Sequence, residues 1–242
     1  GFGTITIAMN DDSSLPDDDM YAYNSEVILT ANVLDSENVG FYYWAHEVDN
    51  IQEISNVNPL TYIVTEENQF TAEFENLCDL SVDINTGEGT INIFVDEGNS
   101  ETLIEDSTAG TYMQTYFCNS EVTLTAESGA DYGFVAWYDG NNSYSGQSIT
   151  FTLDTDITYN AIFNQLFELT LEENDHGTIT HDSNYSLETI YSNTVIELNA
   201  VPNFGWEFSN WTGDLSGEDS PEEILMDENK TVGAIFNPLP YS

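Results

Sequence analysis

The residues with the clearest capacity for chemistry are carboxylates. One short stretch, residues 10–19 (NDDSSLPDDD), holds five aspartates: Asp11, Asp12, Asp17, Asp18 and Asp19. Calcium takes about six to eight oxygen ligands, and carboxylates grouped in a loop are its usual donors. The spacing differs from that of an EF-hand loop. These aspartates are therefore candidate Ca²⁺ ligands, and a solvated loop is the alternative.

The two cysteines are the next candidates. When the repeated segments of the chain are aligned, Cys78 falls opposite Phe167, at the start of a strand, and Cys118 falls opposite Ser192, just before another strand. Two strand ends in one module can lie side by side, and a disulfide closing a loop of about 40 residues stabilises by about 4 kcal/mol. We expect a disulfide and hence an oxidising, extracellular setting. The alternative is a pair of buried free thiols.

Catalytic machinery is not recognisable. The histidines His46, His176 and His181 are scattered and form no zinc-binding spacing. The sequence has no nucleophile elbow and no phosphate-binding glycine loop. Lys230 is the only basic side chain besides histidine, so few cationic groups can stabilise developing negative charge. We predict that the chain is not an enzyme.

Two further residue types can make surface contacts. Glycosylation sequons N-x-S/T begin at four positions, three of them two residues after an aspartate: Asn141, Asn184, Asn210 and Asn229. They are candidate glycosylation sites. Trp206 falls outside the position at which tryptophan recurs and is a candidate for an exposed contact.

The charge balance limits the partners. The chain has 44 acidic residues, one basic residue and a net charge of −43. Nucleic acid is excluded because phosphate binding needs Lys and Arg, and anionic lipid is disfavoured for the same reason. No apolar run reaches the length of about 20 residues that a membrane helix needs, so we expect no membrane insertion. Such a surface suits a salty or calcium-containing medium, or serves solubility alone.

Four motifs recur in fixed order. The first is a glycine-led strand that begins at Gly3, Gly89 and Gly177. The second is an alternating strand ending in alanine, NSEVILTA, NSEVTLTA and NTVIELNA, which begins at Asn24, Asn119 and Asn193. The third pairs an aromatic with a tryptophan three residues on, and the fourth is a closing strand (FTAEF, YNAIF, VGAIF).

The apolar residues of these motifs alternate with period two. In the second motif Val27, Leu29 and Ala31 share one face, which is typical of a half-buried strand in an antiparallel sheet. The regular positions of the aromatic pairs indicate core anchors rather than sugar-stacking platforms: Phe41 and Trp44, Phe134 and Trp137, Phe208 and Trp211. A short helical turn between Ala45 and Ile54 is the only helical structure that we consider. The sequence therefore predicts an all-β fold of three small antiparallel modules in tandem, arranged as a rod.

The repeats set the module boundaries. We place module 1 at 1–76, module 2 at 77–164 and module 3 at 165–237, with 238–242 as the start of a linker or next module. Modules 2 and 3 open with a strand before the glycine motif, Leu80 to Ile84 and Leu169 to Glu173, and module 1 has no such strand. We expect a vacant edge beside Ile5 and Ile7, to be filled either by a longer native chain or by a strand from a neighbouring subunit.

Copy three carries GTIT, IELNAVPNFGWEFSNWTGDLSG and VGAIF, and in this it resembles the divergent InlB B-repeat family. The matching residues include Pro202, Gly205, Gly213 and Asp214, besides the aromatic anchors. Copy two is similar around Gly133, and copy one around Gly40. The resemblance implies a small β-rich module, strung in tandem on secreted or wall-attached proteins, with no catalytic residues and a role in spacing and adhesion.

We therefore expect a non-catalytic structural or adhesive segment of a bacterial or archaeal cell-surface protein or extracellular filament. Its expected partners are neighbouring modules or subunits, and also glycans or another cell surface. Two alternatives stay open: a carbohydrate-binding accessory region of a secreted enzyme, and a fibre subunit that exchanges strands.

Overall fold

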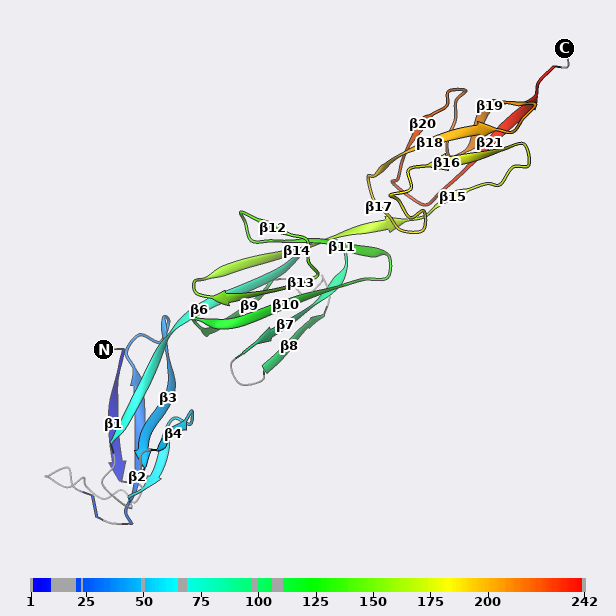
Figure 1. Ribbon diagram of the computed structural model, residues 1–242. Helices are drawn as coiled ribbons and strands as arrows, with labels where there is room; N and C mark the ends of the chain where they lie inside the picture. Colours follow the sequence, from blue (N-terminus) through cyan, green and yellow to red (C-terminus); the bar gives the residue numbers. More distant parts are fainter. Residues whose placement is uncertain are drawn as a thin grey trace.

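The computed structural model describes residues 2–9, 21–22, 24–48, 51–64, 69–96, 100–105 and 111–240. Every regular element in these ranges is a β-strand, and most strand pairs are antiparallel, which confirms the predicted all-β class. The strands form three groups that follow one another along the chain (Figure 1). The rod-like arrangement stays a prediction.

Module 3 has the simplest architecture, two three-stranded sheets that enclose one core. One sheet has the order β16-β18-β20 and the other β15-β21-β19. Side chains from both sheets, among them Ile196, Leu198 and Trp211, form a single apolar cluster. The strands are β15 (Leu169–Leu171), β16 (Gly177–His181), β17 (Ile190–Tyr191), β18 (Val195–Pro202), β19 (Trp206–Gly213), β20 (Glu222–Leu225) and β21 (Lys230–Pro238).

Module 2 repeats this plan with added strands. Its sheets have the orders β13-β10-β7-β8 and β12-β11-β14-β6, and β8 extends the first sheet from the segment inserted between residues 96 and 114. The strands are β6 (Phe70–Thr86), β7 (Gly89–Val95), β8 (Ser100–Glu105), β9 (Tyr112–Phe117), β10 (Ser120–Ser128), β11 (Tyr132–Tyr138), β12 (Ser143–Tyr144), β13 (Ser148–Leu153) and β14 (Ile157–Phe167).

Module 1 contains one sheet of order β1-β2-β5 and a second made by β4, β3 and the first half of β6. Its strands are β1 (Gly3–Met9), β2 (Glu26–Val33), β3 (Val39–Val48), β4 (Ile51–Ser55) and β5 (Leu60–Ile63). The predicted helical turn between Ala45 and Ile54 is wrong, because those two residues pair across the β3–β4 ladder. Ladder pairing with β4 and β6 outweighs any local helical preference there.

The opening strands occupy a different place from the one predicted. In module 3, β15 runs parallel to the closing strand β21, and in module 2 the second half of β6 runs parallel to β14. They therefore lie in the sheet opposite the glycine-led strand. In module 1, β1 is the outer strand of the order β1-β2-β5, so the expected vacant backbone edge beside Ile5 and Ile7 is present among the described residues. The edge that corresponds to the opening strands of modules 2 and 3 is that of β6, which has no strand partner there either.

Two strands pass from one module into the next. The first half of β6 pairs with β3, and from Leu77 onward the same strand pairs with β9 and β14. Likewise β14 pairs with β11 and β6 in module 2, and its last residues pair with β17. The residues that join the modules are thus hydrogen-bonded strand.

The repeated glycine of the first motif has a steric cause. A Cβ added at Gly3, Gly89 or Gly177 would overlap the ring of the closing-strand phenylalanine of the same module: Phe74, Phe163 and Phe236. The repeated asparagines that begin the second motif have a conformational cause. Asn24, Asn119 and Asn193 have φ values of 68°, 69° and 63°, in the left-handed region that asparagine tolerates better than most residues.

Candidate functional site: the junctions between modules

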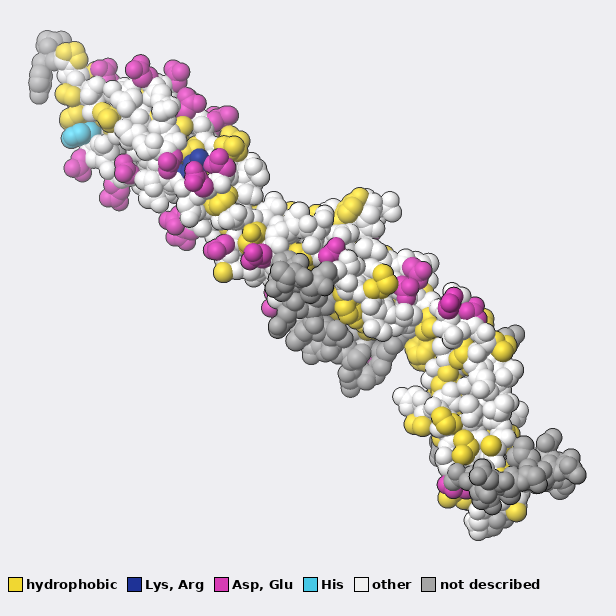
Figure 2. Space-filling view, turned by 180° about the vertical axis from the view of Figure 1, so that it is seen from behind, with side chains coloured by type: hydrophobic (Ala, Val, Ile, Leu, Met, Phe, Trp, Pro, Cys, Tyr) yellow, Lys and Arg dark blue, Asp and Glu magenta, His cyan; other side chains and the backbone are white. Residues whose placement is uncertain are grey.

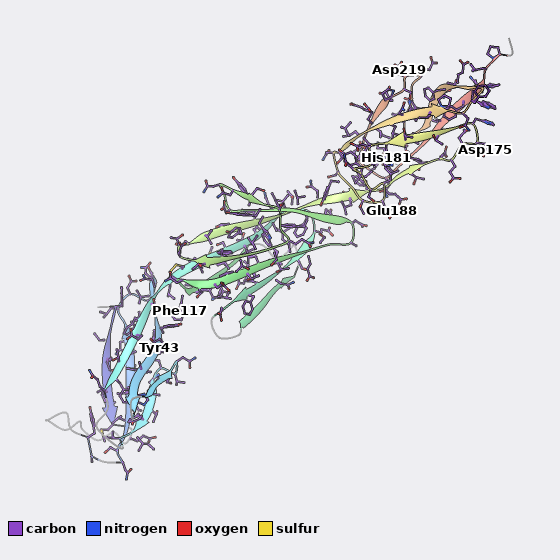
Figure 3. All side chains as sticks on the ribbon, viewed as in Figure 1. Tyr43, Phe117, Asp175, His181, Glu188 and Asp219 are labelled. Carbon is purple, nitrogen blue, oxygen red and sulfur yellow. A yellow bond between two sulfur atoms is a disulfide. The ribbon has the colours of Figure 1, made fainter. Side chains whose placement is uncertain are left out.

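The first junction is built on a glycine and an aromatic ring. Phe117, at the end of β9, pairs with Leu77 of β6 and lies close to the strand of Tyr43 (Figure 3). Its ring packs edge-on against Tyr42 with 4.9 Å between centroids, and a Cβ added at Gly40 would come within 2.7 Å of it. Gly40 thus leaves room on module 1 for a side chain of module 2.

The second junction repeats the first. Tyr191 of β17 pairs with Leu166 of β14, and a Cβ added at Gly133 would come within 2.6 Å of the Tyr191 ring. The Tyr191 hydroxyl donates a hydrogen bond of 3.0 Å to the carbonyl oxygen of Phe134. Gly133 stands one residue before Phe134, as Gly40 does before Phe41, so the same position of the repeat accepts an aromatic ring from the next module.

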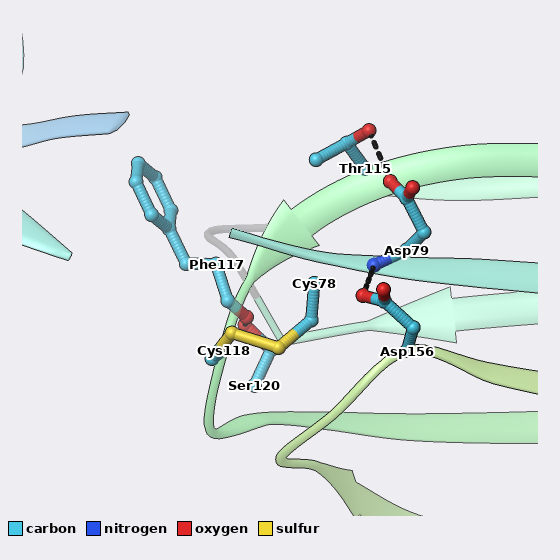
Figure 4. Close-up of a disulfide and its surroundings, with 7 residues drawn as sticks. All are labelled: Cys78, Asp79, Thr115, Phe117, Cys118, Ser120 and Asp156. Atoms are coloured by element: carbon cyan, nitrogen blue, oxygen red, sulfur yellow. Dashed lines mark hydrogen bonds between the residues drawn. A yellow bond between two sulfur atoms is a disulfide. The ribbon is translucent and has the colours of Figure 1, made fainter. Parts of the chain in front are cut away.

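The predicted disulfide between Cys78 and Cys118 is present at the first junction, with 5.2 Å between the Cα atoms (Figure 4). Cys118 directly follows Phe117, whose ring points away from the disulfide and toward the strands of module 1 in Figure 4. The Ser120 hydroxyl donates to the Phe117 carbonyl oxygen over 2.7 Å. The disulfide therefore fixes the strand end that carries the junction ring to β6.

Three of the four tryptophans lie in cores. Trp44 and Trp137 have no exposed surface and Trp211 has 2% exposed, and each packs on its anchor phenylalanine at 5.5, 5.6 and 5.1 Å between centroids. Trp206 is half-buried and stacks on His176 at 3.6 Å with an interplanar angle of 6°. None of the four tryptophans therefore has both faces of its ring exposed to solvent. A more exposed ring, Phe204, stands two residues before Trp206.

The candidate calcium ligands Asp11, Asp12, Asp17, Asp18 and Asp19 lie outside the described residues. Within the described ranges, no three His, Cys, Asp or Glu side chains lie together in a way that would hold a metal ion. On the face drawn in Figure 2, the carboxylates are densest over the last module. On the same face, apolar side chains gather over the first module. The Lys230 ammonium contacts the Asp227 carboxylate at 2.6 Å and lowers its pKa.

The sequon asparagines Asn141, Asn184 and Asn229 are exposed, whereas Asn210 is half-buried and donates its amide to the Trp211 carbonyl oxygen. The Asn229 side-chain oxygen accepts a hydrogen bond from the Glu168 amide. Glycosylation at these four positions stays a prediction.

The aspartates that precede two sequons have a structural role in turns. Asp139 accepts hydrogen bonds from the backbone amides of Asn142 and Asn141, and these bonds hold its pKa well below the usual range. Asp182 accepts a bond of 3.0 Å from the Asn184 amide. Turn geometry is therefore sufficient reason for these two aspartates.

Comparison with known families identifies the repeat. Two consecutive segments, residues 101–166 and 167–240, match the divergent InlB B-repeat domain and together cover more than half of the chain. The chain belongs to the divergent InlB B-repeat family. This confirms the resemblance drawn from copies two and three, and it indicates a repeat module of surface proteins. The two InlB B-repeat matches meet between residues 166 and 167, inside β14.

A search of curated proteins found no match to this InlB B-repeat chain. In the part of the chain that the structure describes, no helix is long and apolar enough to cross a membrane.

The junction pairs are the candidate site residues that the sequence did not reveal. Gly40 and Gly133 are visible as recurring glycines before an aromatic residue, but their partners Phe117 and Tyr191 belong to no recurring motif. The only available signal was the alignment of Cys118 with Ser192, which places Phe117 opposite Tyr191.

Proposed function

We propose that the chain is a non-catalytic spacer or adhesion stalk of a cell-surface protein or extracellular filament. One observation carries the proposal: β6 belongs to the sheets of modules 1 and 2, and β14 extends from the sheet of module 2 to pair with β17 at the start of module 3. A spacer must hold its ends at a set distance. A shared strand serves this because bending at the joint would break ladder hydrogen bonds on both sides of it.

The junction rings support the same role. Phe117 over Gly40 and Tyr191 over Gly133 close the space beside each shared strand. β6 alone has 17 residues, which at about 3.3 Å per residue span about 55 Å. A chain built in this way transmits force through backbone rather than through loops.

The disulfide and the charge support an extracellular location. Disulfides persist in oxidising compartments, and Cys78–Cys118 ties a junction strand. A net charge of −43 suits a medium rich in cations, which screen self-repulsion. Neighbouring modules, other subunits or surface glycans are the partners that this role requires.

Small-angle X-ray scattering of the full chain tests the spacer role. We expect a distance distribution with a long tail, as given by a rod several times longer than it is wide. Limited proteolysis of intact source cells, followed by detection of the released chain, tests the surface location. A compact particle, or a chain cleaved only after cell lysis, would overturn the proposal.

A carbohydrate-binding accessory region is the second candidate, and the solvent-exposed Phe204 beside the Trp206–His176 stack favours it. Affinity electrophoresis in polysaccharide gels, with Phe204→Ser as the comparison, tests this function. Retardation of the unaltered chain that is lost in Phe204→Ser supports it, and equal mobility of both chains excludes it.

A further inference from the structure

The core of module 1 is open on one side. The inward residues of its closing strand, Phe70, Ala72 and Phe74, are only half-buried. Their counterparts are almost fully buried, with exposed fractions of 5, 0 and 1% in module 2 and 0, 6 and 5% in module 3: Tyr159, Ala161 and Phe163, and Val232, Ala234 and Phe236. The side chains at equivalent positions are thus less covered in module 1 than in modules 2 and 3.

An opening strand supplies the cover in the other two modules. Leu80 and Val82 of β6 are buried in the core of module 2, beside β14, and Leu169 of β15 is buried in the core of module 3, beside β21. In both cases the opening strand pairs in parallel with the free edge of the closing strand.

The corresponding edge of β6 has no strand partner among the described residues. Over Phe70–Asn76, β6 pairs with β3 on one edge only. On the glycine-led strand facing this space, Ile5 and Ile7 have 42 and 37% of their surface exposed, whereas Ile91 and Ile93 of module 2 have 1% each. Backbone edge and apolar side chains are therefore open at the same place.

We propose that this edge of β6 binds the opening strand of another divergent InlB B-repeat module, extended and parallel to β6. The two internal modules define the occupant as a segment of the pattern Leu-x-Leu or Leu-x-Val-x-Ile. They also define the register: Val82 lies opposite Tyr159 and Leu171 opposite Val232, so the equivalent residue of the incoming strand lies opposite Phe70. Such strand addition combines ladder hydrogen bonds with burial of alternate side chains. The proposal does not depend on the spacer role.

Charge predicts how this binding responds to salt. Both internal opening strands carry carboxylates, Asp79 and Asp83 in one and Glu168 and Glu172 in the other, and the β6 edge carries Glu73 and Glu75. Like charges repel and are screened by salt. Binding should therefore strengthen as NaCl is added, unlike binding between oppositely charged surfaces.

A synthetic peptide of residues 166–175 (LFELTLEEND) added to the full chain at high NaCl tests the proposal. The readout is amide hydrogen exchange of residues 70–76, with residues 159–163 as the internal reference. Without peptide, residues 70–76 should exchange faster than 159–163. At ten times its dissociation constant the peptide should slow their exchange about elevenfold and leave 159–163 unchanged. The matched control peptide carries Leu169→Asp and Leu171→Asp and should have no effect.

A covalent version covers the case in which the free peptide binds weakly. A second copy of residues 167–175 is placed directly ahead of Phe2, and the control carries the same two Leu→Asp changes in the added copy. The added strand should protect residues 70–76 and raise the melting temperature of module 1, and the control should do neither. The proposal is overturned if residues 70–76 are already as protected as 159–163 in the unaltered chain. It is also overturned if the Leu and Asp versions behave alike in both formats.

Discussion

At the scale of single residues, the junctions depend on the absence of one side chain and the presence of another. Gly40 and Gly133 leave room for Phe117 and Tyr191, and the Tyr191 hydroxyl adds a hydrogen bond to the Phe134 carbonyl oxygen. The core anchors are also residue-level features, and they are not equivalent. Trp137 and Trp211 donate their indole N–H to the carbonyl oxygens of Gln147 and Asp219 at 3.2 and 2.7 Å. The buried Trp44 N–H has no acceptor among the described residues.

Gly133→Val should increase the mobility of module 3 relative to module 2, because the valine side chain would occupy the space of the Tyr191 ring and displace it. We expect faster hydrogen exchange in β17 and a broader scattering distance distribution. Tyr191→Ala should do the same. The double variant should be no worse than either single one, because both changes remove one contact. Additive effects on exchange would mean that Gly133 and Tyr191 act separately.

Trp44→Phe should cost less stability than Trp211→Phe. Both changes remove a similar volume from a core. Only Trp211→Phe also removes a hydrogen bond, the one from the indole N–H to the Asp219 carbonyl oxygen, which is worth about 1 kcal/mol. Denaturant unfolding of each variant, followed by hydrogen exchange within the affected module, measures the difference. A larger loss for Trp44→Phe would contradict the prediction.

At the scale of elements, the strands that cross the junctions join module 2 to a neighbour at each end, through β6 and through β14. β6 closes the sheet of module 1 and opens that of module 2, and the Cys78–Cys118 disulfide holds β9 beside the crossing point. Closing a loop of about 40 residues with a disulfide is worth about 4 kcal/mol in the chain-entropy view. That stabilisation belongs to module 2 and to the face of module 1 that Phe117 covers.

Reduction of the disulfide should therefore act locally. Exchange should rise in β9 and near Gly40, and module 3 should keep its protection because its core cluster includes neither cysteine. Hydrogen exchange with and without reductant measures this, and Cys78→Ser/Cys118→Ser is the matched variant. Equal loss of protection in all three modules, or two titratable thiols in the native chain, would contradict it.

At the scale of the whole molecule, electrostatics oppose folding. The 44 acidic residues are offset by one lysine, which leaves a net charge of −43, and that lysine contacts Asp227. Self-repulsion of this kind is relieved by screening, by bound cations or by protonation. Repulsion should act between modules as well as within them, because the Debye length is about 30 Å at 0.01 M salt, several times the spacing of about 5 Å between neighbouring strands.

The melting temperature should rise with NaCl through screening. We expect a further rise in millimolar CaCl₂ from the candidate ligands Asp17, Asp18 and Asp19. Changing these three to Asn should abolish the calcium-specific increment and keep the NaCl response. The matched control neutralises three exposed acids elsewhere, Asp175, Glu188 and Asp219. Melting curves that are identical in chelator at low salt and in calcium would contradict the ionic requirement.

Acidification should stabilise the chain at first and destabilise it later. From pH 7 downward, protonation of many exposed carboxylates reduces the net charge and hence the repulsion. Asp139 and Asp227 act in the opposite direction. Their folded pKa values lie below the ordinary 3.8, so their contributions are complete above that value and are lost as the pH falls below it.

Thermal melts between pH 7 and pH 2 at low salt should therefore pass through a maximum, and the fall on its acid side should lie below pH 3.8. In high salt the acidic rise should shrink while the fall at low pH remains. Asp139→Asn should weaken that fall. A melting temperature that declines steadily from pH 7 would contradict the dominance of repulsion.

The sequence by itself determined the local structure and the repeat. Val27, Leu29 and Ala31 alternate with polar residues, and this pattern predicts strands because the side chains of a strand point to opposite faces in turn. The glycine-led motif recurs three times, at Gly3, Gly89 and Gly177, and this predicts three modules, each with its own core. The alignment of Cys78 with Phe167 was enough to expect the disulfide.

Only the tertiary structure decided which strands pair. Leu80 and Leu169 begin the opening segments that the sequence predicts as strands. The alternation of apolar and polar residues does not say which strand each of them pairs with. The sequence therefore could not say that these strands run parallel to β14 and β21 rather than beside Ile5 and Ile7. The same holds for β6 and β14, whose continuity through the junctions depends on ladders at both ends, and for Phe117 and Tyr191, whose glycine partners are remote in sequence. Side-chain alternation is a local property of the chain, whereas strand pairing is a choice among many equivalent edges that packing of the whole core makes.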